Sequence, residues 1–237
     1  MTAQSNPEAS SHLRAALAVS DSSARLQAAL AAGTDPFPEY VESLVERCAV
    51  EPDFYVRDML TWALTRHPVD LTVPMLLEEA RSEVPQARSQ ALHTLSKIGD
   101  PRGWAAVTRE VLQDSDDEVA RAAWRAGVVL VQEGEERELA RALALQLGRG
   151  DRSVQLSLSR ALAALGEAAG EAVAAASTHR DEKVRLHAVA TERVMRDPDE
   201  SFEAAVFEAQ RIVALEGAPM VGDEVHESGA ADTRGTG

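Results

Sequence analysis

The apolar residues of this chain recur at spacings of three and four, and the pattern is clearest between Ser82 and Asp114. That spacing is typical of an amphipathic helix with one buried face. The first predicted helix of this stretch has an apolar side made by Ala87, Ala91, Leu92, Leu95 and Ile98. Gly99-Asp100-Pro101 ends it, because glycine readily forms a left-handed C-cap and proline suits the first turn of the next helix. The second predicted helix buries Trp104, Val107, Val111 and Leu112. The stretch therefore predicts a helical hairpin with two apolar stripes.

The same hairpin recurs along the chain with a period of 30 to 35 residues. Each copy has an apolar anchor, and the anchors are Ala24, Val56, Ala87, Val119, Val154 and Val184. An aspartate stands three residues before five of the anchors, namely Asp21, Asp53, Asp116, Asp151 and Asp181. We expect these aspartates to be N-caps, because a carboxylate accepts from the free N–H groups of the first helical turn. The third copy has Val84 in that place, so Ser82 is its expected cap.

A hairpin with two apolar stripes cannot bury both alone, so it stacks against neighbours of its own kind. The pattern therefore predicts an all-α fold, a right-handed α-solenoid of about six helical-hairpin repeats over residues 21–216. Residues 1–20 are expected to hold a loose segment and a capping helix, Glu8–Val19. Residues 217–237 are rich in glycine, alanine and acids, and are expected to be a disordered acidic tail in which Met220-Val221 could dock.

The pattern of Asp, Val-Arg, Ala, Leu and Gly-Asp-Pro resembles HEAT repeats of the armadillo-like superfamily, and it is closest to the short variety of phycobilin lyases. The resemblance covers about residues 21–215, with Ala87–Asp100 its most specific part. In such arrays an arginine commonly bonds to an aspartate of the adjacent unit. The resemblance thus implies an inter-repeat ladder here, made by Arg25, Arg57, Arg88 and Arg185 with the repeated aspartates.

The net charge of −15 favours a basic partner and disfavours nucleic acid and anionic membranes, although acidity also serves solubility alone. No apolar run is long enough to span a membrane, and the N-terminus lacks the pattern of a signal peptide. The single Cys48 cannot form an internal disulfide and lies on an apolar helix side, so we expect a core residue in a reducing cytosol. The expected location is therefore cytoplasmic.

The chain carries no motif of known catalytic chemistry. Its histidines lack metal-binding spacing, and there is neither a nucleophile elbow nor a phosphate-binding glycine loop. We therefore expect a non-catalytic protein without metal or cofactor. His93 is expected to be solvated or partly packed, and the tryptophans Trp62, Trp104 and Trp124 are expected to fill the core.

The resemblance also implies a binding surface, because second helices usually line the concave face of HEAT arrays. The outward positions of the second helices predict a partner-binding set of Glu39, Glu42, Glu46, Thr72, Met75, Glu79, Arg102, Arg109, Glu138 and Arg141. This groove is mixed in charge and acidic at its N-terminal end. An exposed Met75 would be an adaptable contact for a partner.

Three functions compete at this point. The first is a protein-binding scaffold or adaptor that uses the concave face. The second, by resemblance, is a bilin lyase-like or chaperone-like activity on a partner protein. The third is nucleic-acid binding, as in HEAT-like DNA alkylation-repair proteins, which needs a basic groove. Only a local stripe would supply that groove, made by Arg102, Arg109, Arg141, Arg149 and Arg152. The scaffold is favoured because no catalytic constellation is visible.

Overall fold

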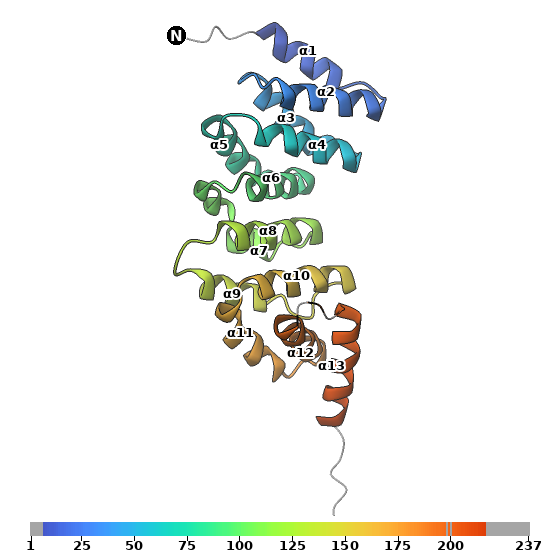
Figure 1. The fold of residues 1–237 in the computed structure, drawn as a ribbon, viewed down its shortest axis with the longest axis vertical. Helices are drawn as coiled ribbons and strands as arrows, with labels where there is room; N and C mark the ends of the chain where they lie inside the picture. The colour runs from blue at the N-terminus through green and yellow to red at the C-terminus, as the bar shows by residue number, and fades with distance from the viewer. Residues whose placement is uncertain (1–6, 198, 200, 217–237) are drawn as a thin grey trace, which may run out of the picture.

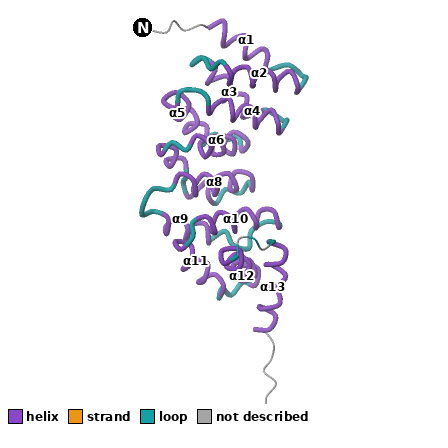
Figure 2. Tube along the Cα trace, viewed as in Figure 1, coloured by secondary structure: helices purple, strands orange, loops and turns teal. Residues whose placement is uncertain are grey.

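The computed structural model describes residues 7–197, 199 and 201–216, and this part of the chain is a stack of helices without any strand. The helices follow one another along the long axis, with the N-terminal helix at one end and the last helix at the other (Figures 1 and 2). An all-α solenoid of helical hairpins is therefore confirmed.

Each hairpin contributes a first helix that packs on the first helix of the next hairpin. These first helices are α2 (Ser22–Thr34), α4 (Phe54–Thr65), α6 (Pro85–Ile98), α8 (Asp117–Leu130), α10 (Arg152–Ala164) and α12 (Glu182–Arg196). The second helices are α3 (Tyr40–Val50), α5 (Val69–Glu79), the 3-10 helix η1 (Pro101–Ala106) with α7 (Arg109–Leu112), α9 (Glu136–Ala144), α11 (Glu167–Ser177) and α13 (Phe202–Glu216). Helix α1 (Pro7–Leu17) precedes them and packs on α2 and α3.

The predicted aspartate caps are confirmed in all five copies that carry them. Each carboxylate accepts a hydrogen bond from backbone N–H groups in the first turn of its helix, at α2, α4, α8, α10 and α12. The third copy differs, because Ser82 accepts only from the N–H of Val84, which precedes the helix. Helix α6 therefore begins without a side-chain cap, and Pro85 removes one of the N–H groups that a cap would satisfy.

Gly33 lies inside a helix, near its C-terminal end. Helix α2 continues through Gly33 to Thr34. A Cβ atom at Gly33 would lie 2.4 Å from the ring of Trp62 and 2.8 Å from the backbone of Ala63. The glycine therefore allows close contact between α2 and α4. Trp62 lies over it at the edge of the core and remains 38% exposed, which corrects its expected place in the core.

The second helix of the third copy is not continuous. It divides into η1 and α7, with Val107 and Thr108 in non-helical conformation between them. Gly103 lies within η1, where a Cβ atom would be 3.1 Å from the Leu130 side chain. Glycine disfavours an α-helix, and Thr108 begins a new one, so the segment forms two short pieces. Its buried side still includes Val111, as predicted, and Trp104 is half-buried.

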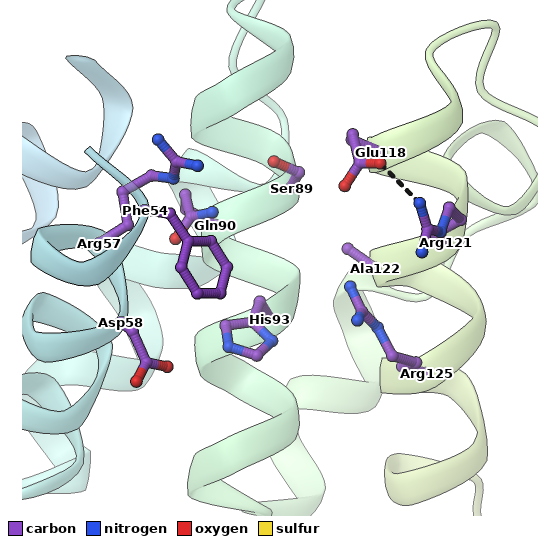
Figure 3. Close-up of a pocket in the computed structure, with 10 residues that line it drawn as sticks. All are labelled: Phe54, Arg57, Asp58, Ser89, Gln90, His93, Glu118, Arg121, Ala122 and Arg125. Carbon is purple, nitrogen blue, oxygen red and sulfur yellow. Dashed lines mark hydrogen bonds and ion pairs between the residues drawn. The ribbon is translucent and has the colours of Figure 1, made fainter. Parts of the chain in front are cut away.

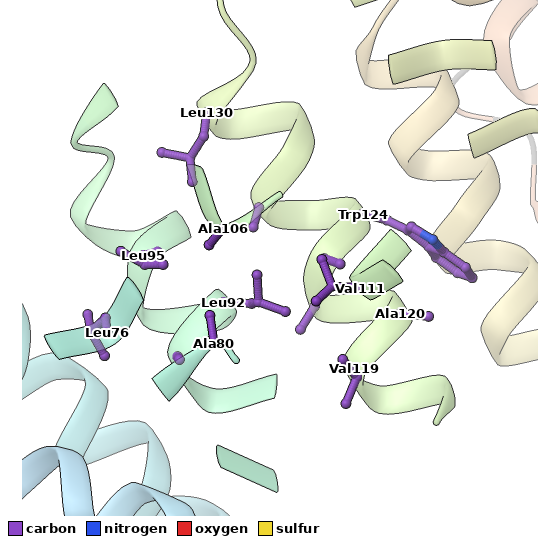
Figure 4. Close-up of a cluster of buried hydrophobic side chains, with 14 of the residues drawn as sticks. Leu76, Ala80, Leu92, Leu95, Ala106, Val111, Val119, Ala120, Trp124 and Leu130 are labelled. Atoms are coloured by element: carbon purple, nitrogen blue, oxygen red, sulfur yellow. The ribbon is translucent and has the colours of Figure 1, made fainter. Parts of the chain in front are cut away.

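The core is a continuous ribbon of side chains that runs along the stack. In its middle Leu92 and Leu95 of α6, Val111 of α7 and Leu130 of α8 meet between neighbouring hairpins (Figure 4). Trp124 is fully buried, and its indole N–H donates to the Leu112 carbonyl at 2.9 Å. Cys48 is confirmed as a core residue, and burial raises the pKa of its thiol to about 12. A separate small cluster joins α12 to α13.

Candidate protein-binding surfaces

The repeated arginines bond first to the backbone of their own repeats. The Nη1 atoms of Arg25, Arg57, Arg88 and Arg185 each donate to the carbonyls five and six residues earlier, at distances of 2.8–3.1 Å. The same contact thus occurs at the beginning of α2, α4, α6 and α12. Each arginine therefore holds the connection that leads into its own helix, a role that the spacing alone did not reveal.

Two of the four arginines expected in the inter-repeat ladder, Arg25 and Arg88, pair with an acid of the next repeat, but the N-cap aspartates are not those acids. Arg25 bonds to Glu51, and Arg88 bonds to Asp114. Both acids stand two residues before an N-cap aspartate and accept that aspartate's backbone N–H at 2.9 Å. The N-cap carboxylates are occupied by N–H groups of the first turn, so the earlier acid receives the arginine.

The next junction reverses this arrangement. Ala120 replaces the arginine after the fourth anchor, and Arg149 occupies the place of the acid. Arg149 reaches back to the carboxylate of Asp117 at 2.8 Å and to the Asp114 carbonyl. Its guanidinium also lies over the Trp124 ring, 6.0 Å from the centroid. This junction therefore also has an ion pair between repeats, but here the earlier repeat supplies the acid and the later one supplies the arginine.

Glu51 is the most buried acid of these junctions. Its side chain has no exposed area, and it accepts hydrogen bonds from Arg25, Arg47 and the Asp53 N–H. Burial raises its pKa, but these hydrogen bonds outweigh that effect and lower the pKa to about 2. Glu51 is thus an ionised group inside the array. Exposed ion pairs contribute little to stability, whereas removing one partner of a buried pair such as this one is costly.

The predicted binding residues near the N-terminus gather around one hollow. It has a volume of about 630 Å³ and lies between α1, α3 and α5. Its lining includes Glu39, Glu42 and Met75 of the predicted set. Arg14 of α1 lies against the carboxylates of Glu42 and Glu46, at 3.6 Å and 2.9 Å. The acidic end of the second-helix face is therefore partly neutralised by the capping helix.

Thr72 does not lie as predicted, and Met75 is less exposed than predicted. Thr72 is fully buried, and its hydroxyl donates to the Pro68 carbonyl at 3.0 Å. Met75 is half-buried and packs against the core. Helix α5 is rotated so that Thr72, Val73 and Leu76 face inward together. Glu79 is half-buried, on the side of α5 near Cys48.

A second hollow on this face holds three more predicted residues, Arg109, Glu138 and Arg141. We call it the α7–α9 hollow. It has a volume of about 730 Å³, and its other lining residues are Trp104, Val107, Leu112, Glu135, Leu139, Ala142 and Leu145. Leu145 is 67% exposed although it is apolar. Arg102 lies outside this hollow and instead bonds to Asp70 and Asp100.

The face made by the first helices carries a hollow that sequence reasoning missed. We call it the arginine hollow. It has a volume of about 290 Å³ and is lined by Phe54, Arg57, Asp58, Ser89, Gln90, His93, Glu118, Arg121, Ala122 and Arg125 (Figure 3). These residues come from α4, α6 and α8 in succession. The available signal was the register of α6 and α8, because the lining residues at positions two, three and six after each anchor lie on the same helix side.

His93 lies in this hollow and is half-buried, so it is partly packed as expected. Burial lowers its pKa, and the nearby Arg125 and Lys97 lower it further. The histidine is therefore neutral near pH 7.

Ser159 and His187 form a close serine–histidine pair, but its role is structural. Ser159 Oγ lies 3.0 Å from His187 Nε2, but both side chains are buried between α10 and α12. His187 Nδ1 accepts the backbone N–H of Gly148, and Thr191 bonds to Ser159 at 2.8 Å. Burial lowers the pKa of His187 to about 4. A substrate has no access to this group, which joins neighbouring repeats.

The described part of the chain shows neither a cluster of metal ligands nor a membrane-spanning helix. No three histidine, cysteine or acidic side chains there converge as metal ligands do. None of the helices described is both long and apolar enough to cross a bilayer. Three of the five arginines in the stripe considered for nucleic acid are ion-paired with acids, namely Arg102, Arg141 and Arg149.

Comparison with known families agrees with this architecture. Residues 41–127 match a family described as HEAT repeats. The matched segment runs from α3 almost to the end of α8, so it includes the second, third and part of the fourth hairpin. It does not distinguish the phycobilin-lyase variety from other HEAT repeats. No curated protein matches the chain.

Proposed function

Because this chain is a HEAT-repeat protein, we propose that it is a non-catalytic scaffold that binds another protein through its second-helix face. A stack of hairpins offers an extended surface on which a peptide, a helix or a domain can lie. The proposed scaffold extends over residues 21–216, with α1 as its N-terminal cap. A buried, reduced Cys48 suits a reducing compartment such as the cytoplasm.

The α7–α9 hollow is the observation that carries this proposal. Trp104 and Leu145 present apolar surface there, and Arg109, Glu138 and Arg141 surround it with charge. Binding energy in protein interfaces concentrates on aromatic and arginine side chains within such polar rims. An exposed leucine beside a half-buried tryptophan is therefore a suitable anchor site for an apolar side chain of the partner.

The N-terminal hollow would extend the contact. Its lining includes Glu39, Glu42 and Asp70, and the whole chain carries a net charge of −15. Charge complementarity raises association rates and selects partners. The favoured partner of the second-helix face is therefore a protein with an apolar anchor and a basic flank.

Affinity capture with matched variants tests the proposal. The intact chain, Leu145→Glu and Val129→Glu would each be immobilised and exposed to lysate of the source organism. Leu145 lies in the α7–α9 hollow, whereas Val129 lies on α8 outside it and is 56% exposed. Both substitutions place a carboxylate at an exposed apolar position. A protein captured by the intact chain and by Val129→Glu, but at least tenfold depleted with Leu145→Glu, would support the proposal.

Two results would contradict this proposal. One is a partner that Leu145→Glu and Val129→Glu capture equally well, which would show that the contact lies outside the α7–α9 hollow. The other is the absence of any captured protein, which would reopen small-molecule or enzymatic roles.

A further inference from the structure

The arginine hollow lies on the opposite set of helices from the proposed scaffold face and needs its own explanation. Arg57 comes from α4, His93 from α6, and Arg121 and Arg125 from α8. Figure 3 shows Arg125 extending from α8 toward His93, with Phe54 on the other side of the same space. Three successive repeats thus contribute to one small cationic surface.

The guanidinium groups of the hollow are incompletely neutralised. Arg57 uses Nη1 for the carbonyls of Glu51 and Pro52 rather than for an acid. Arg121 pairs with Glu118 at 2.8 Å. Arg125 has no carboxylate within ion-pair distance among the residues that the structure describes.

The side chains that line the hollow carry more positive than negative charge. Desolvation lowers the pKa of Arg125, and the neighbouring Arg121 lowers it further. Three arginines face only two acids, Asp58 and Glu118. This local excess of positive charge stands on a chain whose net charge is −15.

An exposed aromatic side chain adjoins these cations. Phe54 is 66% exposed and lies beneath the Arg57 guanidinium, 5.9 Å from ring centroid to Cζ. Tyr55 beside it is 74% exposed, with the two rings 5.6 Å apart. Exposed aromatic surface next to arginine is a composition that interfaces favour over ordinary surface. The pair supplies an apolar contact at the edge of the cationic hollow.

We infer that the arginine hollow binds an acidic peptide segment of a partner protein, with carboxylates on Arg121 and Arg125 and an apolar side chain on Phe54. Carboxylates match the forked donors of arginine. A nucleic-acid backbone fits less well, because Asp58 and Glu118 border the hollow and the chain as a whole repels polyphosphate. This surface is separate from the α7–α9 hollow, so it adds a second binding face to the proposed scaffold.

Selection from a random-dodecapeptide phage library on the full-length chain tests the inference. Enriched peptides would be synthesised with fluorescein, and their dissociation constants measured by fluorescence anisotropy. We expect Asp and Glu enrichment with at least one apolar residue. Arg125→Glu should weaken binding at least tenfold, whereas Arg160→Glu, at an exposed position on α10 outside both hollows, should leave it unchanged. Phe54→Ser should also weaken binding, although it alters no charge.

Several outcomes would overturn the inference. These are peptides without acidic enrichment, no enriched peptide at all, and equal effects of Arg125→Glu and Arg160→Glu. A labelled single-stranded oligonucleotide would serve as the alternative ligand. If it binds the chain, displaces the peptides and loses affinity with Arg125→Glu, the ligand of the hollow is nucleic acid rather than an acidic peptide. None of these results bears on lysate capture by the Leu145 variant, so the two proposals fail separately.

Discussion

Glu51 shows how a single buried side chain can join three segments of an array. It links Arg25 of α2, Arg47 of α3 and the N–H of Asp53 just before α4. An ionised carboxylate without exposed area is stable only because its oxygens receive these donors. The first repeat is therefore joined to the second through charge as well as through apolar packing.

Replacement of Glu51 by Gln tests that role. The amide keeps the shape but leaves the buried guanidinium group of Arg25 and the half-buried one of Arg47 without a carboxylate. We expect a loss in the free energy of unfolding of about 3 kcal/mol, measured by urea denaturation. Glu46→Gln is the matched control, since Glu46 pairs with Arg14 at an exposed position. Equal small losses in both variants would show that Glu51 is not a junction of special importance.

His187 predicts a pH dependence of stability. Its pKa is about 4 in the folded chain because of burial, against an ordinary value of 6.5. Between these values the unfolded state binds more protons, so the stabilising contribution is complete above pH 6.5 and falls as the pH falls toward 4. We expect the free energy of unfolding to fall by about 2 kcal/mol between pH 7 and pH 5 because of His187.

Urea denaturation at both pH values would measure this loss. The buried His67 and the half-buried His93 also have lowered pKa values and add to the total. The test is therefore the difference between the intact chain and His187→Gln, which should depend less on pH. His179→Gln, at an exposed position, should keep the full dependence. An unchanged dependence in His187→Gln would contradict the assignment.

At the scale of elements, the contact between α2 and α4 depends on the missing side chain of Gly33. Packed helices tolerate little added volume at their closest approach. A Cβ atom at this position meets the Trp62 ring and the Ala63 backbone, and backbone cannot move aside cheaply. The distance between these first helices is therefore set by one glycine.

Two glycine-to-alanine substitutions compare this contact with an open position. Gly33→Ala should destabilise the chain by about 1 to 3 kcal/mol, because the two helices must separate. Gly170→Ala in α11, where no atom lies within 4 Å of the added Cβ, should stabilise it by about 0.5 to 1 kcal/mol. Thermal and urea unfolding would measure both. Stabilisation by Gly33→Ala would show that α2 and α4 are not in close contact.

At the scale of the whole molecule, stability is distributed along the stack. Repeats of a solenoid contact mainly their neighbours, so a local defect remains local. The last junction has its own apolar cluster, in which Phe202, Ala205 and Val206 of α13 meet Ala190 and Val194 of α12. The C-terminal hairpin is therefore expected to open independently of the middle repeats.

Hydrogen exchange measured by mass spectrometry tests this separation. Phe202→Ala should greatly accelerate amide exchange in α13 and the adjoining part of α12, since it removes the largest side chain of their cluster. Exchange in α6 and α8 should be unchanged. Leu92→Ala, in the central core, should instead accelerate exchange in α6 and α8. A uniform increase over the whole chain in Phe202→Ala would indicate one cooperative unit.

The sequence by itself determined most of the helices, their period and how five of the six first helices begin. Spacings of three and four define an apolar stripe, and a capping aspartate acts within one helical turn, so both signals are local. Asp53, Asp116 and the other capping aspartates therefore behave as predicted. The same holds for Trp124 and Cys48, which lie in the middle of apolar stripes and are buried.

Only the tertiary structure decided how far each helix is rotated and what meets across the gap between repeats. Thr72 is buried and Met75 is half-buried because the rotation of α5 is set by packing against neighbouring helices rather than by its own pattern. The arginine hollow and the position of Glu51 likewise bring together side chains from different repeats. Such contacts depend on the distance and angle between helices, which are set by packed side-chain volume and are not encoded in any single local window.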